Sequence, residues 1–335
     1  MIIVVTETAQ VNLLPQRKPL DLLDPARWQP GVGVANGTFG ELLQGALQKN
    51  DDHFLVTLPI QKFSTARFTP DASATRITVT PAHKTKSLKL VQKLLHHYGF
   101  SIGGHLAIES ELPEGKGLAS SSADLVATVR ALEATLGHAI PTELLLATLR
   151  TIEPTDGVMY HEFVTFFHRK VELVRRLGFP SRLKVVAIDA GGQMDTIEYN
   201  KRNYLFTDEE CAEYADLLHS IESAIRSNDL ERLGRITTRS AILNQKRNPN
   251  RYLDRVMAIR QQTNALGVVV AHSGPCLGLL FPNEPAWERQ IGRATTLLAE
   301  LTDQVFMVES LAPTTNGRCA DNAENSIRYT NRKTA

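Results

Sequence analysis

The chain has 335 residues, of which 42% are hydrophobic and 22% are charged, and its formal net charge is +1. This length and composition are those of a globular protein with a sizeable core and room for two domains. A charge so close to zero gives no sign of the basic surface that nucleic-acid binding requires, and no stretch approaches the roughly 18 apolar residues of a membrane span. We therefore expect neither a nucleic acid nor a membrane as a partner.

The first residues and the cysteines both indicate a reducing compartment. The opening apolar run, MIIVV, ends at Thr6, so it is too short for a secretion signal and lacks the basic residues that precede one. Three cysteines, Cys211, Cys276 and Cys319, are far apart and odd in number, which does not fit a disulfide framework or a cysteine metal site. We expect a cytoplasmic protein, either a monomer or a homodimer.

Residues 1–30 are rich in Pro, Gln, Asp and Arg and predict an N-terminal extension with one strand, over 2–5. Further on, apolar residues at helical spacing predict a helix over 87–98. Short runs of β-branched and apolar residues predict strands over 31–35, 54–59, 64–68, 76–80 and 105–110.

The clearest helical signal follows residue 119. An apolar stripe runs along one face of this segment, and Gly137 stands at the C′ position where helices commonly end. Two further helices are predicted, over 142–151 and over 159–177, because Pro154 and Gly178 follow them as stop signals. The stripe consists of Leu125, Val126, Val129, Leu132 and Leu136.

Pro180 marks the expected boundary between two domains. Beyond it, 183–189 is predicted as a strand and 194–198 as its hairpin partner. Helices are then expected over 208–226, 229–242, 250–264 and 285–300, and strands over 267–271, 277–281 and 304–309.

The predicted order of elements determines the expected organisation. Because strands and helices mix without strict βαβ alternation, the fold class is α+β rather than a doubly wound sheet. The expected parts are an extension at 1–30, an N-terminal domain at 31–180, a C-terminal domain at 181–312 and a polar, flexible tail at 313–335.

The run LPEGKGLASSSAD at 112–124 carries the clearest chemical signal of the chain. Small residues surround Lys116, and three serines then open a helix. Small residues let the backbone approach a phosphate, and a helix N-terminus presents free N–H groups and the positive end of the helix dipole. The serine hydroxyls could cap the helix, contact phosphate oxygens or ligate a metal. The same pattern also suits a plain glycine turn with a helix cap, and its spacing is neither a Walker A loop nor a dinucleotide fingerprint.

Three other segments add to this signal. They are VANGTFGELLQG at 34–45, IEPTDG at 152–157 and VAHSGPCL at 270–277. Taken singly, each suits an ordinary structural role: a hairpin turn, a helix stop and a type II turn.

The order and spacing of the four segments resemble the GHMP kinases, which include galactokinase, homoserine kinase and mevalonate kinase. The central P-x-x-x-G-L-G-S-S-A motif of that family stands here as PEGKGLASSSA at 113–123. The runs IEPTD at 152–156, IDAGGQMDT at 188–196 and AHSG at 271–274 are similar to the L-threonine kinases of cobalamin and propanediol metabolism. The resemblance covers about residues 31–310. It implies a ribosomal protein S5 domain 2-like N-terminal domain and a ferredoxin-like C-terminal domain.

The resemblance also implies a role for each matching residue. Ser121 would ligate Mg²⁺, with Glu153 as the second metal ligand. Asp156 would orient the acceptor hydroxyl or take its proton, and Lys116 would neutralise phosphate charge during catalysis. The implied ATP-binding residues are Pro113, Glu114, Gly115, Lys116, Gly117, Leu118, Ala119, Ser120, Ser121 and Ser122. The implied substrate-binding residues are Asn36, Thr38, Gly40, Glu41, Asp156, Ser273 and Gly274.

Several features depart from the family pattern, among them the HSGPC run at 272–276, which is shorter than the glycine run of the family, and the N-terminal extension. Ala119 replaces the last glycine of the central motif, which costs little if its backbone φ is negative. Asn36 and its neighbours stand where the family usually has a proline, which leaves the acceptor open. We expect a kinase that uses ATP and Mg²⁺ to phosphorylate a small-molecule hydroxyl, preferably that of L-threonine to give O-phospho-L-threonine. The alternatives are another acceptor, such as serine, homoserine or a specialised metabolite, and a non-catalytic sensor that binds ATP and a ligand.

Overall fold

The computed structural model describes residues 25–49, 51–192 and 204–313. The predicted strand at 2–5, the hairpin partner at 194–198 and the tail after 313 lie outside these residues. None of the helices in the described ranges combines the length and hydrophobicity of a membrane span.

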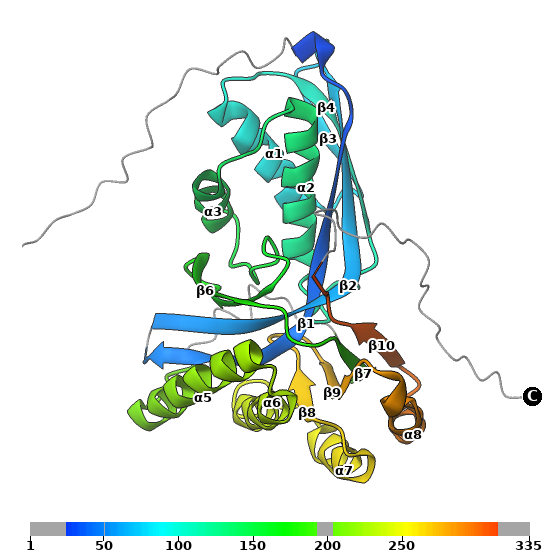
Figure 1. Cartoon of the computed structure of the whole chain (residues 1–335). Helices are drawn as coiled ribbons and strands as arrows, with labels where there is room; N and C mark the ends of the chain where they lie inside the picture. The colour runs from blue at the N-terminus through cyan, green and yellow to red at the C-terminus, as the bar shows by residue number, and fades with distance from the viewer. Residues whose placement is uncertain (1–24, 50, 193–203, 314–335) are drawn as a thin grey trace, which may run out of the picture.

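One mixed sheet runs through the described part of the chain (Figure 1). Its main path has the order β10-β7-β9-β8-β1-β2-β4-β3, while β5 pairs with β2 and β6 pairs with β5. Only the β3–β4 pair is parallel among the described strands. The strands are β1 Gly31–Gln48, β2 Asp51–Asp71, β3 Ile77–Thr80, β4 Gly103–Ser110, β5 Phe163–Phe167, β6 Glu172–Gly178, β7 Leu183–Asp189, β8 Gly267–Val270, β9 Cys276–Pro282 and β10 Val305–Glu309.

Helices cover this sheet in two groups (Figure 1). One group, α1 to α3, lies beside the part of the sheet that holds β1 to β4. In the other group, α5 and α6 pack on β1, and α6 to α8 lie beside the part that holds β7 to β10. The mixture of sheet and helices confirms the expected α+β class. The helices are α1 Thr85–His97, α2 Ser120–Leu136, α3 Thr142–Arg150, α5 Asp208–Ser227, α6 Leu230–Asn244, α7 Leu253–Thr263 and α8 Glu288–Ala299.

Helix α2 packs closely on β1, and this contact holds the helix against the sheet. A Cβ on Gly31 would lie 2.1 Å from the carbonyl oxygen of Ala131, and a Cβ on Gly33 would lie 2.3 Å from that of Ala127. Only glycine leaves room for such an approach. The helix begins at Ser120 and ends at Gly137 in a left-handed cap, as predicted.

Strand β1 joins the two halves of the sheet. It pairs with β2 along its length and reaches β8 where Glu41 lies opposite Val270. Both β1 and β2 are longer than the short strands predicted within them, because register shifts between residues 36 and 43 let one strand bend without ending. The expected domain boundary at Pro180 stays a prediction.

The prediction of a helix over 159–177 is wrong. The structure has the hairpin β5–β6 there, and β5 extends the sheet by pairing with β2, with Leu55 opposite Phe166. The FVTFF run of β5 is rich in aromatic and β-branched residues, which suit a pleated, buried surface better than a helix. Apart from β1 and β2, the remaining predicted helices and strands within the described ranges are confirmed to within a few residues.

Candidate functional site

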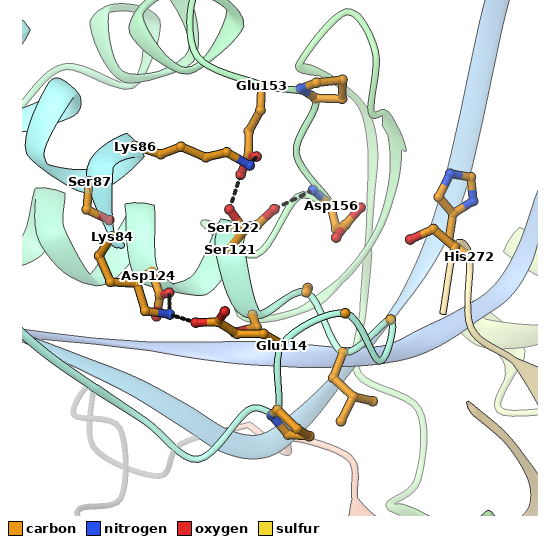
Figure 2. A pocket seen from close by; sticks show the side chains of 18 of the residues that line it. Lys84, Lys86, Ser87, Glu114, Ser121, Ser122, Asp124, Glu153, Asp156 and His272 are labelled. Carbon is orange, nitrogen blue, oxygen red and sulfur yellow. Dashed lines mark hydrogen bonds and ion pairs between the residues drawn. The ribbon is translucent and has the colours of Figure 1, made fainter. Parts of the chain in front are cut away.

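A cavity of about 260 Å³ lies where the N-termini of α1 and α2 meet the loop before α2 and the segment after α3 (Figure 2). The structure thus brings together residues from all four segments that the sequence singled out. The sequence-predicted residues that line the cavity are Glu41, Pro113, Glu114, Gly115, Gly117, Leu118, Ala119, Ser120, Ser121, Ser122, Glu153, Asp156 and Ser273.

The loop at 113–119 turns through three left-handed residues. Gly115 has a φ of +70°, Gly117 of +77° and Ala119 of +58°. The expectation that Ala119 has a negative φ is therefore wrong, and its Cβ costs roughly 1–2 kcal/mol in this conformation. These turns bring the loop backbone around to the first turn of α2, where it lines the cavity.

The backbone of β1 holds this loop in place. The N–H of Thr38 donates to the carbonyl of Leu118 at 3.3 Å, and the N–H of Gly40 donates to that of Gly117 at 3.3 Å. Asn36, Thr38 and Gly40 are not in the cavity lining, so their predicted contact with the substrate stays a prediction. In the structure this segment positions the loop.

The AHSG turn holds the loop from the other side. A Cβ on Gly274 would lie 2.1 Å from the carbonyl carbon of Lys116, and a Cβ on Gly117 would lie 2.4 Å from the Cβ of Ala271. The two segments therefore pack backbone against backbone. Ser273 lines the cavity, whereas Gly274 does not.

This contact makes Gly274→Ala an informative substitution. The added methyl group meets backbone, which cannot rotate away as a side chain can, so we expect a loss of about 1–3 kcal/mol in the free energy of unfolding and weaker ATP binding. Gly292→Ala is the matched control, because nothing lies within 4 Å of its Cβ position on α8. It should stabilise the protein by about 0.5–1 kcal/mol. Urea unfolding of both variants checks the prediction, which an unchanged Gly274 variant would contradict.

The N-terminus of α2 faces the cavity. In the described part of the chain no side chain caps this helix, its first turn contains no acidic residue, and Ser120 Oγ is buried with no hydrogen-bond partner. Free N–H groups at the positive end of a helix dipole bind anions such as phosphates. This wall of the cavity therefore suits a phosphate group.

Ser121 and Glu153 come together at the same end of α2. The hydroxyl of Ser121 donates to Glu153 Oε1 at 2.5 Å, although the two residues are 32 positions apart. The Glu153 side chain is only 4% exposed, and its other oxygen pairs with Lys86 Nζ. A hydroxyl and a carboxylate are the hard oxygen donors that Mg²⁺ prefers, so these two residues fit the predicted metal site.

Asp156 lies beside this pair (Figure 2). Its backbone N–H donates to Ser122 Oγ at 3.3 Å. Burial, and then the negative charge of Glu153, raise the pKa of Asp156 from 3.8 to about 7. Such a carboxylate can take a proton near neutral pH.

Glu41 is a third acidic group of the cavity and belongs to β1. It is 2% exposed, and burial, followed by the charge of Asp156, raises its pKa well above its usual value. Its Oε2 has no hydrogen-bond partner among the described residues. The end of the cavity between Glu41 and Asp156 is therefore acidic and suits a polar acceptor.

Lys84 and Asp124 also line the cavity, and neither was predicted. Lys84 Nζ pairs with Asp124 Oδ2 at 2.6 Å and also with Glu114, which ties α1 to α2 and to the loop. Ser64 Oγ donates to the other oxygen of Asp124 at 2.5 Å. Basic residues are unfavourable at a helix N-terminus, so the lysines of KTKS at 84–87 were a signal that could have indicated Lys84, although not its partner Asp124.

The predicted catalytic residue Lys116 lies outside the cavity lining. Lys116 Nζ pairs with Asp189 Oδ2 at 2.6 Å and donates to the carbonyl of Gly192 at 2.6 Å, outside the cavity lining. Its catalytic role stays a prediction.

His272 lines the cavity, and its Nδ1 lies 2.7 Å from Gln44 Oε1. Burial, aided by the nearby His168, lowers the pKa of His272 well below its usual value, so the imidazole is neutral.

The chain matches models of one enzyme family in two places. Residues 85–160 match the N-terminal domain of GHMP kinases, and residues 221–294 match the C-terminal domain. An L-threonine kinase from Citrobacter freundii is 27% identical over 257 residues, which cover 75% of this chain and 86% of that protein. An L-threonine kinase from Salmonella typhimurium is 28% identical over 276 residues, which cover 80% and 88%.

Solved structures share the fold at low identity. A homoserine kinase from Cytophaga hutchinsonii is 14% identical with a TM-score of 0.66, covering 85% of this chain and 96% of that one. A mevalonate kinase from Methanococcus jannaschii is also 14% identical, with a TM-score of 0.64 and coverage of 85% and 99%.

Proposed function

The chain belongs to the GHMP kinase family, and on that premise we propose that it transfers the γ-phosphate of ATP to the hydroxyl of L-threonine, giving O-phospho-L-threonine. The general reaction, phosphorylation of a hydroxyl group by ATP, is that of the family. The proposal concerns the acceptor, the metal and the residues that act.

One observation carries the proposal: Ser121, Glu153 and Asp156 meet at the uncapped N-terminus of α2. Phosphoryl transfer depends on positioning and charge neutralisation more than on covalent chemistry. The helix N-terminus would bind the phosphates, while Ser121 and Glu153 would hold Mg²⁺. When bound, that ion neutralises negative charge on the phosphate oxygens.

Asp156 would act on the acceptor. Its carboxylate would accept a hydrogen bond from the acceptor hydroxyl and take the proton as the oxygen bonds to phosphorus. The raised pKa supports this role, because a base with a pKa near 7 binds the proton more strongly than an ordinary carboxylate does. Mg²⁺ would thus neutralise the charge of the phosphates, and Asp156 would position the acceptor hydroxyl.

Two alternatives compete with the threonine proposal. The first is a different amino-acid alcohol, such as homoserine or serine. The second is a sensor that binds ATP and a ligand without turnover. The presence of Ser121, Glu153 and Asp156 in one cavity favours catalysis, since a sensor has no need of all three.

The acceptor is tested by ADP release with L-threonine, L-serine, L-homoserine and related hydroxy compounds, beside a control without acceptor. We expect kcat/KM for L-threonine to exceed that for L-serine by about tenfold or more, because one methyl group that a substrate site accommodates contributes roughly 10- to 200-fold. A preference for L-homoserine would contradict the acceptor but not the reaction. ATP binding without turnover of any compound would favour the sensor.

A further inference from the structure

The cavity contains two lysines, and they are held in different ways. Lys84 is 11% exposed and is fixed between Asp124 and Glu114. Lys86 is 40% exposed and pairs with one carboxylate, Glu153. A lysine with a flexible stem and one partner can move without disturbing the fold, whereas Lys84 cannot.

The partner of Lys86 belongs to the metal site of the proposed function. Glu153 Oε2 pairs with Lys86, while Glu153 Oε1 accepts the hydrogen bond from Ser121. Figure 2 shows Lys86 reaching from α1 toward this pair. In the structure, therefore, the ammonium occupies a position next to the oxygens that would hold Mg²⁺.

The position of Lys86 on its own helix is unfavourable. It is the second residue of α1, where the positive end of the helix dipole repels a cation. The buried charge of Glu153 offsets this repulsion and also needs a counter-charge of its own. A divalent cation bound to Glu153 would remove that attraction and add a repulsion, so Lys86 would leave the carboxylate.

We propose that Lys86 is a mobile phosphate-binding residue, whose ammonium neutralises Glu153 in the ligand-free enzyme and moves to the terminal phosphate of ATP when a divalent cation binds. The inference rests on the proposed function, because it assumes phosphates beside α2 and a metal at Glu153. Lys86 lies at the end of the cavity that holds Glu153 and Asp156, where the transferred group would lie. A cation there stabilises the charge of the phosphoryl group in flight.

The test removes the charge of Lys86 and measures three affinities that do not depend on any acceptor. In Lys86→Met, Mn²⁺ binding to the nucleotide-free protein, followed by electron paramagnetic resonance, should tighten about tenfold, because the ammonium no longer competes for Glu153. Affinity for MgATP should weaken about tenfold, while affinity for MgADP changes less than about twofold. Lys86→Arg keeps the charge and should retain the metal affinity of the original protein.

Lys89→Met is the matched control, since Lys89 is exposed on the same helix and does not line the cavity. It should change none of the affinities. If Lys86 only ties α1 to Glu153, Lys86→Met will lower thermal stability and will not tighten Mn²⁺ binding, and the proposal is then wrong. Equal loss of ATP and ADP affinity would also overturn it. If no acceptor were phosphorylated, the Mn²⁺, MgATP and MgADP affinities could still be measured. That result would contradict the proposed function but not the role of Lys86.

Discussion

Replacing Asp156 by Asn is expected to lower kcat by about 10²- to 10⁴-fold, the usual contribution of a general base, while affinity for ATP changes less than about threefold. Asn keeps the size of the side chain but cannot take a proton. The contact of Asp156 with Ser122 is made by its backbone N–H, which Asn retains, so the substitution should spare the phosphate-binding loop. Steady-state kinetics and nucleotide titration of the variant check both parts. A variant with normal kcat would remove Asp156 from the chemistry.

The pH dependence of activity gives an independent readout of the same residue. With a pKa of about 7, Asp156 is protonated below neutral pH and cannot accept the hydroxyl proton. Activity should therefore fall as pH decreases through about 7, and the residual activity of Asp156→Asn should lack this decline. A wild-type profile that is flat between pH 6 and pH 8 would contradict the assignment.

The raised pKa of Asp156 should also affect stability. The free energy of unfolding should fall as pH rises, whereas activity should increase. The folded state binds the proton of Asp156 more strongly than the unfolded chain, where the pKa is near 3.8, so the charged carboxylate destabilises the fold as pH rises from about 4 to about 7. Asp156→Asn should therefore be more stable than the original protein at pH 8, by about 1–3 kcal/mol, and the difference should vanish toward pH 4.

The second large effect is expected at the metal site. Glu153→Gln should lower kcat/KM by about 10²-fold at limiting Mg²⁺, because the amide replaces a charged ligand by a neutral one. Ser121→Ala should act in the same direction with a smaller effect. Since the two groups contact each other, the losses should not add in the double variant.

Titration of activity against Mg²⁺ distinguishes this account from a loss of folding. Both variants should need more Mg²⁺ for half-maximal rate and should regain activity as the ion is raised. Glu143→Gln, on the exposed first turn of α3, is the control and should match the original protein. Unchanged Mg²⁺ dependence in both Ser121→Ala and Glu153→Gln would exclude them as metal ligands.

The sequence was most informative where a signal is local. The loop before α2, the start of that helix at Ser120 and its end at Gly137 follow from small residues, serines and an apolar stripe within about 25 residues. The hairpin β5–β6 was missed because its Phe residues also suit helical spacing, and the strand that decides between the two, β2, lies more than 100 residues earlier.

The charges of the cavity were missed for the same reason. Lys84 pairs with a carboxylate 40 residues away, and Lys86 with one 67 residues away, so neither pair can be recognised from spacing. The raised pKa values of Glu41 and Asp156 depend on burial by several elements, which only the folded chain shows. Motif reading located Ser121, Glu153 and Asp156, but not Lys86, which pairs with Glu153.

The most direct test of the account is product analysis after incubation with MgATP and L-threonine. Mass spectrometry should find O-phospho-L-threonine in a one-to-one ratio with ADP, and Asp156→Asn should give almost none of either. ADP without phosphothreonine, or ATP bound without any transfer across the acceptor panel, would contradict the proposed reaction.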